Sequence, residues 1–196
     1  DLYSNLLNRA KTDKKCTAVL FKFSESSKEN QNLFVDDLNW LLFDLPTVDD
    51  TFRLFLSIFR NNEYRDKIGL SDQFVHFLIR IVKSGNAFNI GVVPSILRRF
   101  NMTKDFAEKL QKNGFFRIYY ESAIAMNDPE VNMKAAILLD QTCRIFFTDD
   151  LLLFMPRLRE MASIRDQADV AINVATSLSY FQPFRESLVR CGFVQA

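Results

Sequence analysis

The sequence has few of the residues that make turns and few of those that bind metals. Its 196 residues include five glycines, five prolines, three cysteines and one histidine. Strand-rich folds need many turns and use more glycine and proline, whereas long helices need few. Because 48% of the residues are apolar and 25% are charged, a disordered chain is excluded. The composition therefore favours a folded, helix-rich protein.

The cysteines show neither a disulfide framework nor a metal site. Cys16, Cys143 and Cys191 are odd in number and far apart, and no CxxC or Cys/His ligand spacing occurs. We expect free thiols in a protein of the cytoplasm or nucleus, and no bound metal or cofactor. No signal peptide is visible, and no apolar run approaches the ~18 residues that a membrane-spanning helix needs, so no membrane span is expected.

An excess of one charge is also lacking. The chain carries 25 basic and 24 acidic side chains, for a net charge of +1. This balance excludes a strong overall field that would attract DNA, RNA or an anionic membrane, although a local charged patch stays open.

Catalytic motifs are missing as well, since neither GxGxxG nor GxxxxGK occurs. The single histidine, His76, has no convincing acid–base partner at helical spacing and fits an exposed helix position. The acidic pairs at 36–37, 49–50 and 149–150 each stand at a predicted helix start, where carboxylates cap backbone N–H groups. We therefore predict that the chain is not an enzyme.

Apolar residues recur at helical spacing through most of the chain. In the segment 130–146 the buried stripe is predicted to hold Val131, Ala135, Leu138, Thr142 and Ile145. Further helices are predicted at 51–60, 71–85, 92–100 and 168–181, with breaks at 43–50, 126–130, 146–150 and 162–169. No convincing alternating strand pattern is present. The predicted fold class is all-α, in one continuous helical body.

One sequence phrase occurs twice. FAEKLQKNGFF (106–116) and FRESLVRCGFV (184–194) share Phe, Glu, Leu and Gly-Phe at matching places, and Gly114 and Gly192 stand 78 residues apart. Related positions fall near 37, 72, 114, 153 and 192, which makes that gap two periods of about 39 residues. A unit of this length cannot bury its apolar face alone and gains a core by stacking on its neighbours.

At these residues the chain resembles the armadillo-repeat family, whose units have about 40 residues and three helices. Segments 110–145 and 158–194 follow the family order of an apolar residue four places before Gly, a second helix, a break and a third helix. The resemblance implies a right-handed superhelical solenoid of about four three-helix repeats. Its approximate units would be 1–29 (partial), 30–64, 65–106, 107–146, 147–185 and 186–196 (partial). Because both ends fall inside a unit, we expect a fragment of a longer protein with further repeats.

In this family the third helices line a concave groove. The resemblance therefore implies a groove lined by the polar side chains of these helices, which point outward because the apolar side chains face the core. These candidate partner-binding residues are Arg53, Ser57, Arg60, Ser95, Arg99, Gln141, Arg144, Asn173, Ser177 and Tyr180. Arginine offers a planar fork of donors to carboxylate or phosphate, and Asn and Gln can hold a peptide backbone. The expected function is a scaffold or adaptor that binds an extended, acidic or phosphorylated polypeptide.

The nuclear-import receptors of the family carry Trp and Asn four residues apart on the third helix. The matching pairs here are Arg53/Ser57, Ser95/Arg99, Ile137/Gln141 and Asn173/Ser177. Because no Trp–Asn ladder is present, we do not expect binding of the basic import signals that those receptors recognise.

Other interpretations remain open. The outward face could be solvated surface without a partner. The chain could instead be a structural, chaperone or regulatory module for a cytoskeletal client, like UCS-type chaperones or formin regulatory domains, with Tyr119, Tyr120 and Tyr180 as an aromatic surface. An enzyme would need a pocket that joins His76 to a carboxylate or cysteine. Nucleic acid is the weakest option, since acids such as Asp140 dilute the positive strip.

Overall fold

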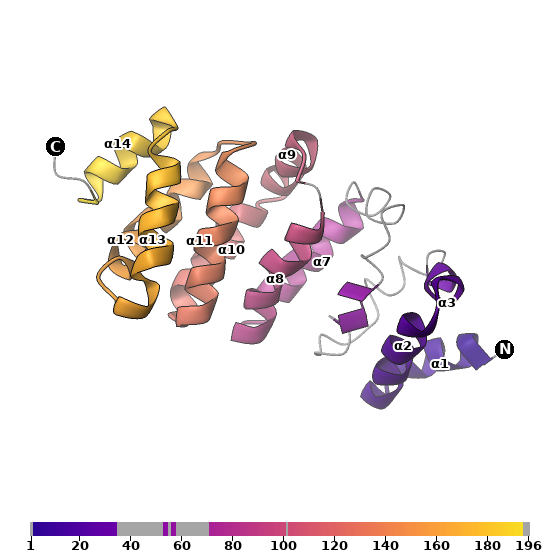
Figure 1. Ribbon diagram of the computed structural model, residues 1–196. Helices are drawn as coiled ribbons and strands as arrows, with labels where there is room; N and C mark the ends of the chain where they lie inside the picture. Colours follow the sequence, from indigo (N-terminus) through magenta and orange to yellow (C-terminus); the bar gives the residue numbers. More distant parts are fainter. Residues whose placement is uncertain (1, 35–52, 55, 58–70, 101, 194–196) are drawn as a thin grey trace. The chain divides into compact units, whose positions relative to one another are not determined.

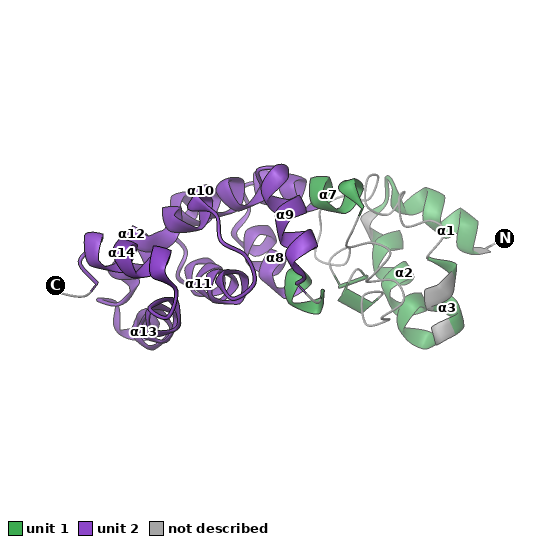
Figure 2. Ribbon diagram, turned by 90° about the horizontal axis from the view of Figure 1, so that it is seen from above, with its two compact units in different colours: residues 1–77, 96–101 green, residues 78–95, 102–196 purple. Residues whose placement is uncertain are grey.

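The computed structural model describes residues 2–34, 53–54, 56–57, 71–100 and 102–193, in which helices occur and no strand (Figure 1). The all-α prediction is confirmed for these residues. The chain divides into two compact units, residues 1–77 with 96–101 and residues 78–95 with 102–196 (Figure 2). Within the predicted helix 51–60, the described residues 53–54 and 56–57 are helical. The predicted acidic caps at 36–37 and 49–50 lie outside the described residues.

The first unit begins with three short helices, α1 (Leu2–Ala10), α2 (Lys14–Ser26) and α3 (Lys28–Leu33). Asp13 caps the start of α2, because its Oδ1 accepts the backbone N–H of Lys15 at 2.9 Å. Aromatic rings hold the three helices together: the Tyr3 and Phe34 rings meet edge-on at 5.2 Å, and Phe23 lies 6.3 Å from Phe34.

Two helices contribute residues to both units, α7 (Asp72–Lys83) and α8 (Ala87–Arg99). Gly85 follows α7 in the left-handed conformation, with φ of 68°. Asn86 then starts α8, because its side-chain oxygen accepts the N–H of Phe88 at 2.9 Å. This cap explains why α8 begins at Ala87, five residues before the predicted start at 92.

The rest of the second unit is a succession of helices. They are α9 (Lys104–Lys112), α10 (Phe115–Met126), α11 (Pro129–Cys143), the 3₁₀ helix η1 (Asp149–Phe154), α12 (Met155–Met161), α13 (Arg165–Leu178) and α14 (Gln182–Arg190). Figure 2 shows α11 and α13 end-on along one side of this unit and α10 and α12 along the other. In addition α11 packs directly on α13, and α10 packs on η1. The unit therefore has two layers with its core between them.

Bulky aromatic side chains fill this core. Tyr119 and Tyr120 on α10 are fully buried, and the Tyr120 ring lies 5.5 Å from that of Phe154 on η1. Near α14, Phe147 and Phe184 meet edge-on at 5.3 Å. Among the described residues, packing between helices therefore accounts for the buried aromatic rings.

The repeated phrase has the same local structure at both places. Gly114 and Gly192 follow α9 and α14, two helices of nine residues, with φ of 72° and 73°. Each glycine N–H bonds to the carbonyl three residues earlier, Gln111 at 2.8 Å and Val189 at 3.0 Å. A side chain disfavours this left-handed backbone, which accounts for glycine at both positions.

The predicted bounds of two helices are wrong by a few residues. Helix α11 stops at Cys143 instead of 146, so Ile145, predicted for the core stripe, is 39% exposed. The N–H groups of Ile145 and Phe146 both bond to the carbonyl of Thr142, which turns the chain away from the helix axis. Helix α13 covers Arg165–Leu178 instead of 168–181. The other four predicted stripe residues of α11 are buried.

Asp150 is not the helix cap that the sequence predicted. No side chain caps the start of η1, and the Asp150 side chain is only 10% exposed. Its Oδ1 accepts Nε of Arg117 at 3.1 Å, and its Oδ2 accepts Nε2 of Gln111 at 2.9 Å. The carboxylate therefore ties α9 and α10 to η1 with charge-assisted bonds.

We predict that Asp150→Ala lowers the free energy of unfolding by about 1–2 kcal/mol, because the donors of Gln111 and Arg117 lose their acceptor. Asp149→Ala is the matched control. Its exposed side chain should matter by less than about 0.5 kcal/mol. Urea denaturation of the original protein and the two variants measures the loss in free energy of unfolding for each variant. Equal losses for Asp150→Ala and Asp149→Ala would contradict the assigned role of Asp150.

We further predict opposite effects of alanine at two glycines. At Gly114 a Cβ meets nothing within 4 Å, yet φ of +72° makes alanine cost about 1–2 kcal/mol. At Gly91, inside α8, a Cβ has ordinary contacts of 3.6–3.7 Å, so alanine should stabilise by up to about 1 kcal/mol through helix propensity. Chemical denaturation measures both, and a stabilising Gly114→Ala would disprove the backbone argument.

Candidate functional site

The predicted groove residues of the first unit differ in their accessibility. Arg53 and Arg99 are exposed there. Ser57, however, is only 2% exposed and its hydroxyl lies 3.3 Å from that of Ser24, so it is an interior residue and not an outward one. The outward placement of Ser57 was therefore wrong. Arg60 lies outside the described residues.

In the second unit, the structure brings most of the other predicted residues together. Ile137 and Gln141 on α11 and Arg144 just after it follow each other at helical spacing, and Asn173, Ser177 and Tyr180 do the same on and just after α13. Nη2 of Arg144 donates to the Ser177 hydroxyl at 2.9 Å and so joins the two rows. We call the surface formed by these six residues the α11–α13 face. Ser95 is exposed separately on α8.

Each cation near this face has a carboxylate one helical turn earlier. Arg144 pairs with Asp140 at 3.0 Å, and Lys134 pairs with Glu130 at 2.6 Å. Such i,i+4 pairs are worth only tenths of a kcal/mol in solvent, but they limit the rotamers of the cations. The local charge is therefore balanced, and the arginine is held in position.

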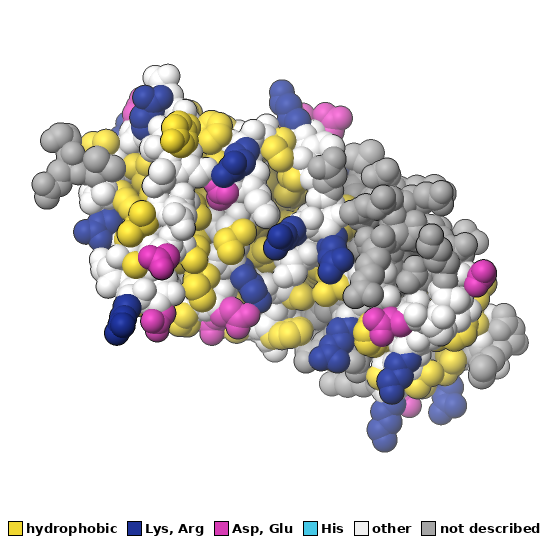
Figure 3. All heavy atoms as spheres, viewed as in Figure 1, with side chains coloured by type: hydrophobic (Ala, Val, Ile, Leu, Met, Phe, Trp, Pro, Cys, Tyr) yellow, Lys and Arg dark blue, Asp and Glu magenta, His cyan; other side chains and the backbone are white. Residues whose placement is uncertain are grey.

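The sequence named Tyr180 on this face as a binding residue but did not name Ile137. Ile137 is 42% exposed and Tyr180 is 77% exposed. Figure 3 shows yellow side chains among the charged ones over α11 and α13. The available signal was the pair Ile137/Gln141, which matches the Trp–Asn pair on the third helix of the import receptors. Clustered exposed apolar groups are a feature of interaction sites.

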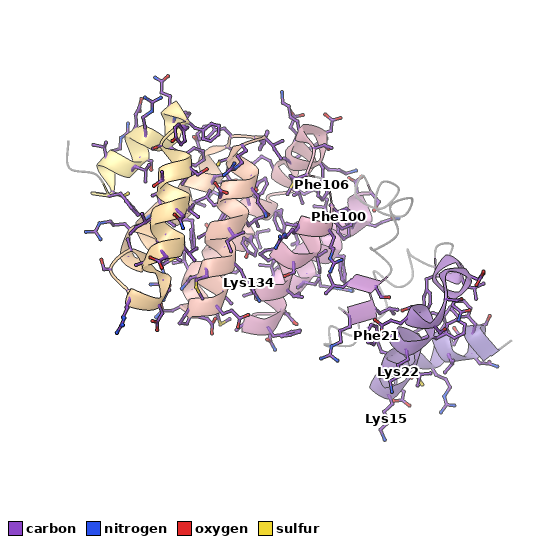
Figure 4. All side chains as sticks on the ribbon, in the orientation of Figure 1. Lys15, Phe21, Lys22, Phe100, Phe106 and Lys134 are labelled. Atoms are coloured by element: carbon purple, nitrogen blue, oxygen red, sulfur yellow. The ribbon has the colours of Figure 1, made fainter. Side chains whose placement is uncertain are left out.

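A cavity of about 250 Å³ opens between the first half of α8 and the start of α11. On α8 it is lined by Phe88, Gly91 and Ser95 among others, and on α11 by Val131 and Lys134. Figure 4 labels Lys134 on the side of α11 that faces α8. All of these residues belong to the second unit.

The described residues contain no cluster suited to metal binding or acid–base catalysis. Over these residues no group of three or more His, Cys, Asp or Glu side chains could hold a metal ion. His76 is exposed on α7, as predicted. Burial, with a smaller effect of Asp140, raises the pKa of Cys143 to about 12 and makes it a poor nucleophile. Burial also raises the pKa of Tyr119 and Tyr120, so these tyrosines belong to the interior and offer no aromatic surface.

No family model matches the chain, and neither a curated protein nor a solved structure matches it. The resemblance to armadillo repeats stays a prediction. Among the described helices, none combines the length and apolar character that crossing a bilayer requires.

The raised pKa of Cys143 gives a test of this site. At pH 8 a thiol with a pKa of about 12 has a thiolate fraction of roughly 10⁻⁴, so iodoacetamide should hardly modify Cys143 in the folded protein. Cys191, which is half-buried, should react first. Mass spectrometry of tryptic peptides follows both, with urea-unfolded protein as the control in which the two react alike. Equal rates in the folded protein would contradict the burial of Cys143.

Proposed function

We propose that this chain is a protein-interaction module, a scaffold or adaptor, whose α11–α13 face binds an extended polypeptide. The observation that carries the proposal is the bond between Arg144 and Ser177 on a face whose two rows also expose Ile137 and Tyr180. Apolar groups contribute affinity because binding buries them. An arginine held in one orientation determines how the polypeptide lies on the face. Arginine and tyrosine are also enriched in the residues that dominate protein interfaces.

Arg144 has donors left for a ligand. Its bonds to Asp140 and Ser177 all come from Nη2, and the side chain is 58% exposed. A guanidinium has five N–H donors, so Nε and Nη1 can each still donate a hydrogen bond to an oxygen of a carboxylate or phosphate. This supports a polypeptide with an acidic or phosphorylated residue at this position. Because Asp140 offsets part of the charge, the geometry of one contact selects the ligand more than a broad positive field does.

The proposed architecture is an armadillo-type solenoid in which α11 and α13 are equivalent third helices. Two observations support it: the packing of α11 on α13, and the common structure of the segments around Gly114 and Gly192. A protein of the cytoplasm or nucleus agrees with its free cysteines. The chaperone interpretation needs Tyr119, Tyr120 and Tyr180 on the surface. Tyr119 and Tyr120 are buried, so of these three aromatic residues only Tyr180 can contact a client.

We predict that Arg144→Glu weakens binding of selected peptides at least tenfold, since a sheltered charge-assisted contact is worth roughly 1.5–3 kcal/mol. The probe is a phage-displayed library of random 12-residue peptides. Selected peptides are then synthesised and measured by fluorescence anisotropy, with versions that carry phosphoserine in place of Asp or Glu.

Arg190→Glu is the matched control, because Arg190 is also an exposed arginine that pairs with a carboxylate four residues earlier, Glu186. It lies on α14, outside the α11–α13 face, and its replacement should leave affinity unchanged. If Arg144→Glu and Arg190→Glu bind the peptides as well as the original protein does, or if no peptide is selected, the proposed function is wrong.

A further inference from the structure

We propose that the cavity between α8 and α11 binds one large apolar side chain, aromatic or branched aliphatic, of the polypeptide on the α11–α13 face. This inference rests on the proposed function and adds a ligand motif to it. The cavity is about 250 Å³. Pockets for free drug-sized molecules are generally ~300–1,000 Å³, so a single side chain fits better than a separate small ligand.

The walls of the cavity are mainly apolar. They include Ala87, Phe88 and Val92 from α8 and Val131 from α11, and Phe88 is 48% exposed. A ligand side chain here would be removed from water against these groups, and an aromatic ring could also pack against the Phe88 ring.

The charged residues of the lining, Asp128, Glu130 and Lys134, already have partners. Oδ1 of Asp128 accepts the N–H of Val131 at 2.9 Å and caps α11, while Glu130 pairs with Lys134. A charged ligand side chain would compete with these bonds, whereas an apolar one would leave them intact. The cavity therefore selects by shape and apolar contact.

The position of the cavity defines a spacing in the ligand. Lys134 lies at the cavity, and Arg144 lies ten residues further along the chain, as the residue that caps the C-terminal end of α11. At a rise of 1.5 Å per residue these side chains are separated by ~15 Å along α11. An extended chain advances ~3.3 Å per residue, so ~4–5 ligand residues cover this distance. The expected motif is a large apolar residue and, four or five positions away, Asp, Glu or a phosphorylated residue.

Gly91 is what keeps the cavity open. A Cβ built there lies 3.6 Å from Nζ of Lys134 and 3.7 Å from Cγ2 of Val131, across the space between α8 and α11. These are ordinary contacts, so alanine fits, while a leucine side chain would extend into the cavity. Because φ of Gly91 is not in the left-handed region, leucine suits the helix at this position.

The test uses the full chain and the peptides selected in the phage experiment. Gly91→Leu should weaken their binding about tenfold or more, because it occupies the space of the apolar side chain. Ala125→Leu, at an exposed position on α10 in the other layer, adds the same side chain elsewhere and should change nothing. Thermal melts monitored by circular dichroism check that each variant is folded.

A second measurement does not depend on any protein variant. Replacing the apolar residue of a selected peptide by alanine should weaken binding to the original protein about tenfold. It should then add little to the effect of Gly91→Leu, since both changes remove one contact.

The results separate the two proposals. If peptides bind and Arg144→Glu weakens them, but neither Gly91→Leu nor the alanine peptide does, the cavity inference is overturned and the proposed function stands. Equal weakening by Gly91→Leu and Ala125→Leu also overturns the inference. Failure to select any peptide overturns both.

Discussion

The packing of α11 against α13 is the interaction on which the candidate site depends. Both helices bury alanines, Ala135 and Ala136 on α11 and Ala171 and Ala175 on α13. The distance between packed helices follows the size of the side chains at their contact, and small residues permit a close approach. With α11 packed on α13, the side chain of Arg144 reaches the Ser177 hydroxyl. The exposed face is therefore a product of the core beneath it.

The carboxylates on the same helix change what the cations can do. Asp140 and Glu130 stand one turn before Arg144 and Lys134 and hold them by ion pairs. A cation held in this way loses less side-chain entropy when a ligand binds than a freely rotating one does. The cost is a weaker long-range field, in agreement with the nearly neutral sequence. Affinity on this face would therefore depend more on local contacts than on overall charge.

The sequence was sufficient where local physics determines the structure. Helical spacing located α7, α11 and α13 to within a few residues, and the glycines of the repeated phrase fall at the left-handed turns of Gly114 and Gly192. It was insufficient where the outcome depends on distant partners. Ser57 is an interior residue whose hydroxyl lies against that of Ser24. Asp150 does not cap a helix, because its carboxylate binds Gln111 and Arg117 instead. No periodicity reports contacts between residues 33 or 39 positions apart.

The cavity at Gly91 was hidden for the same reason, and it gives α11 two different neighbours. Against α8, the first half of α11 leaves a cavity, whereas Arg144, just past the end of α11, forms a hydrogen bond with Ser177 on α13. A polypeptide lying along α11 would therefore need a side chain of suitable shape near Lys134 and an acidic or phosphorylated residue near Arg144. Neither contact alone is specific, since apolar side chains and acids are common in proteins. Their fixed separation on one rigid helix is what can distinguish one ligand from another, because a helix does not adjust its length to the chain it binds.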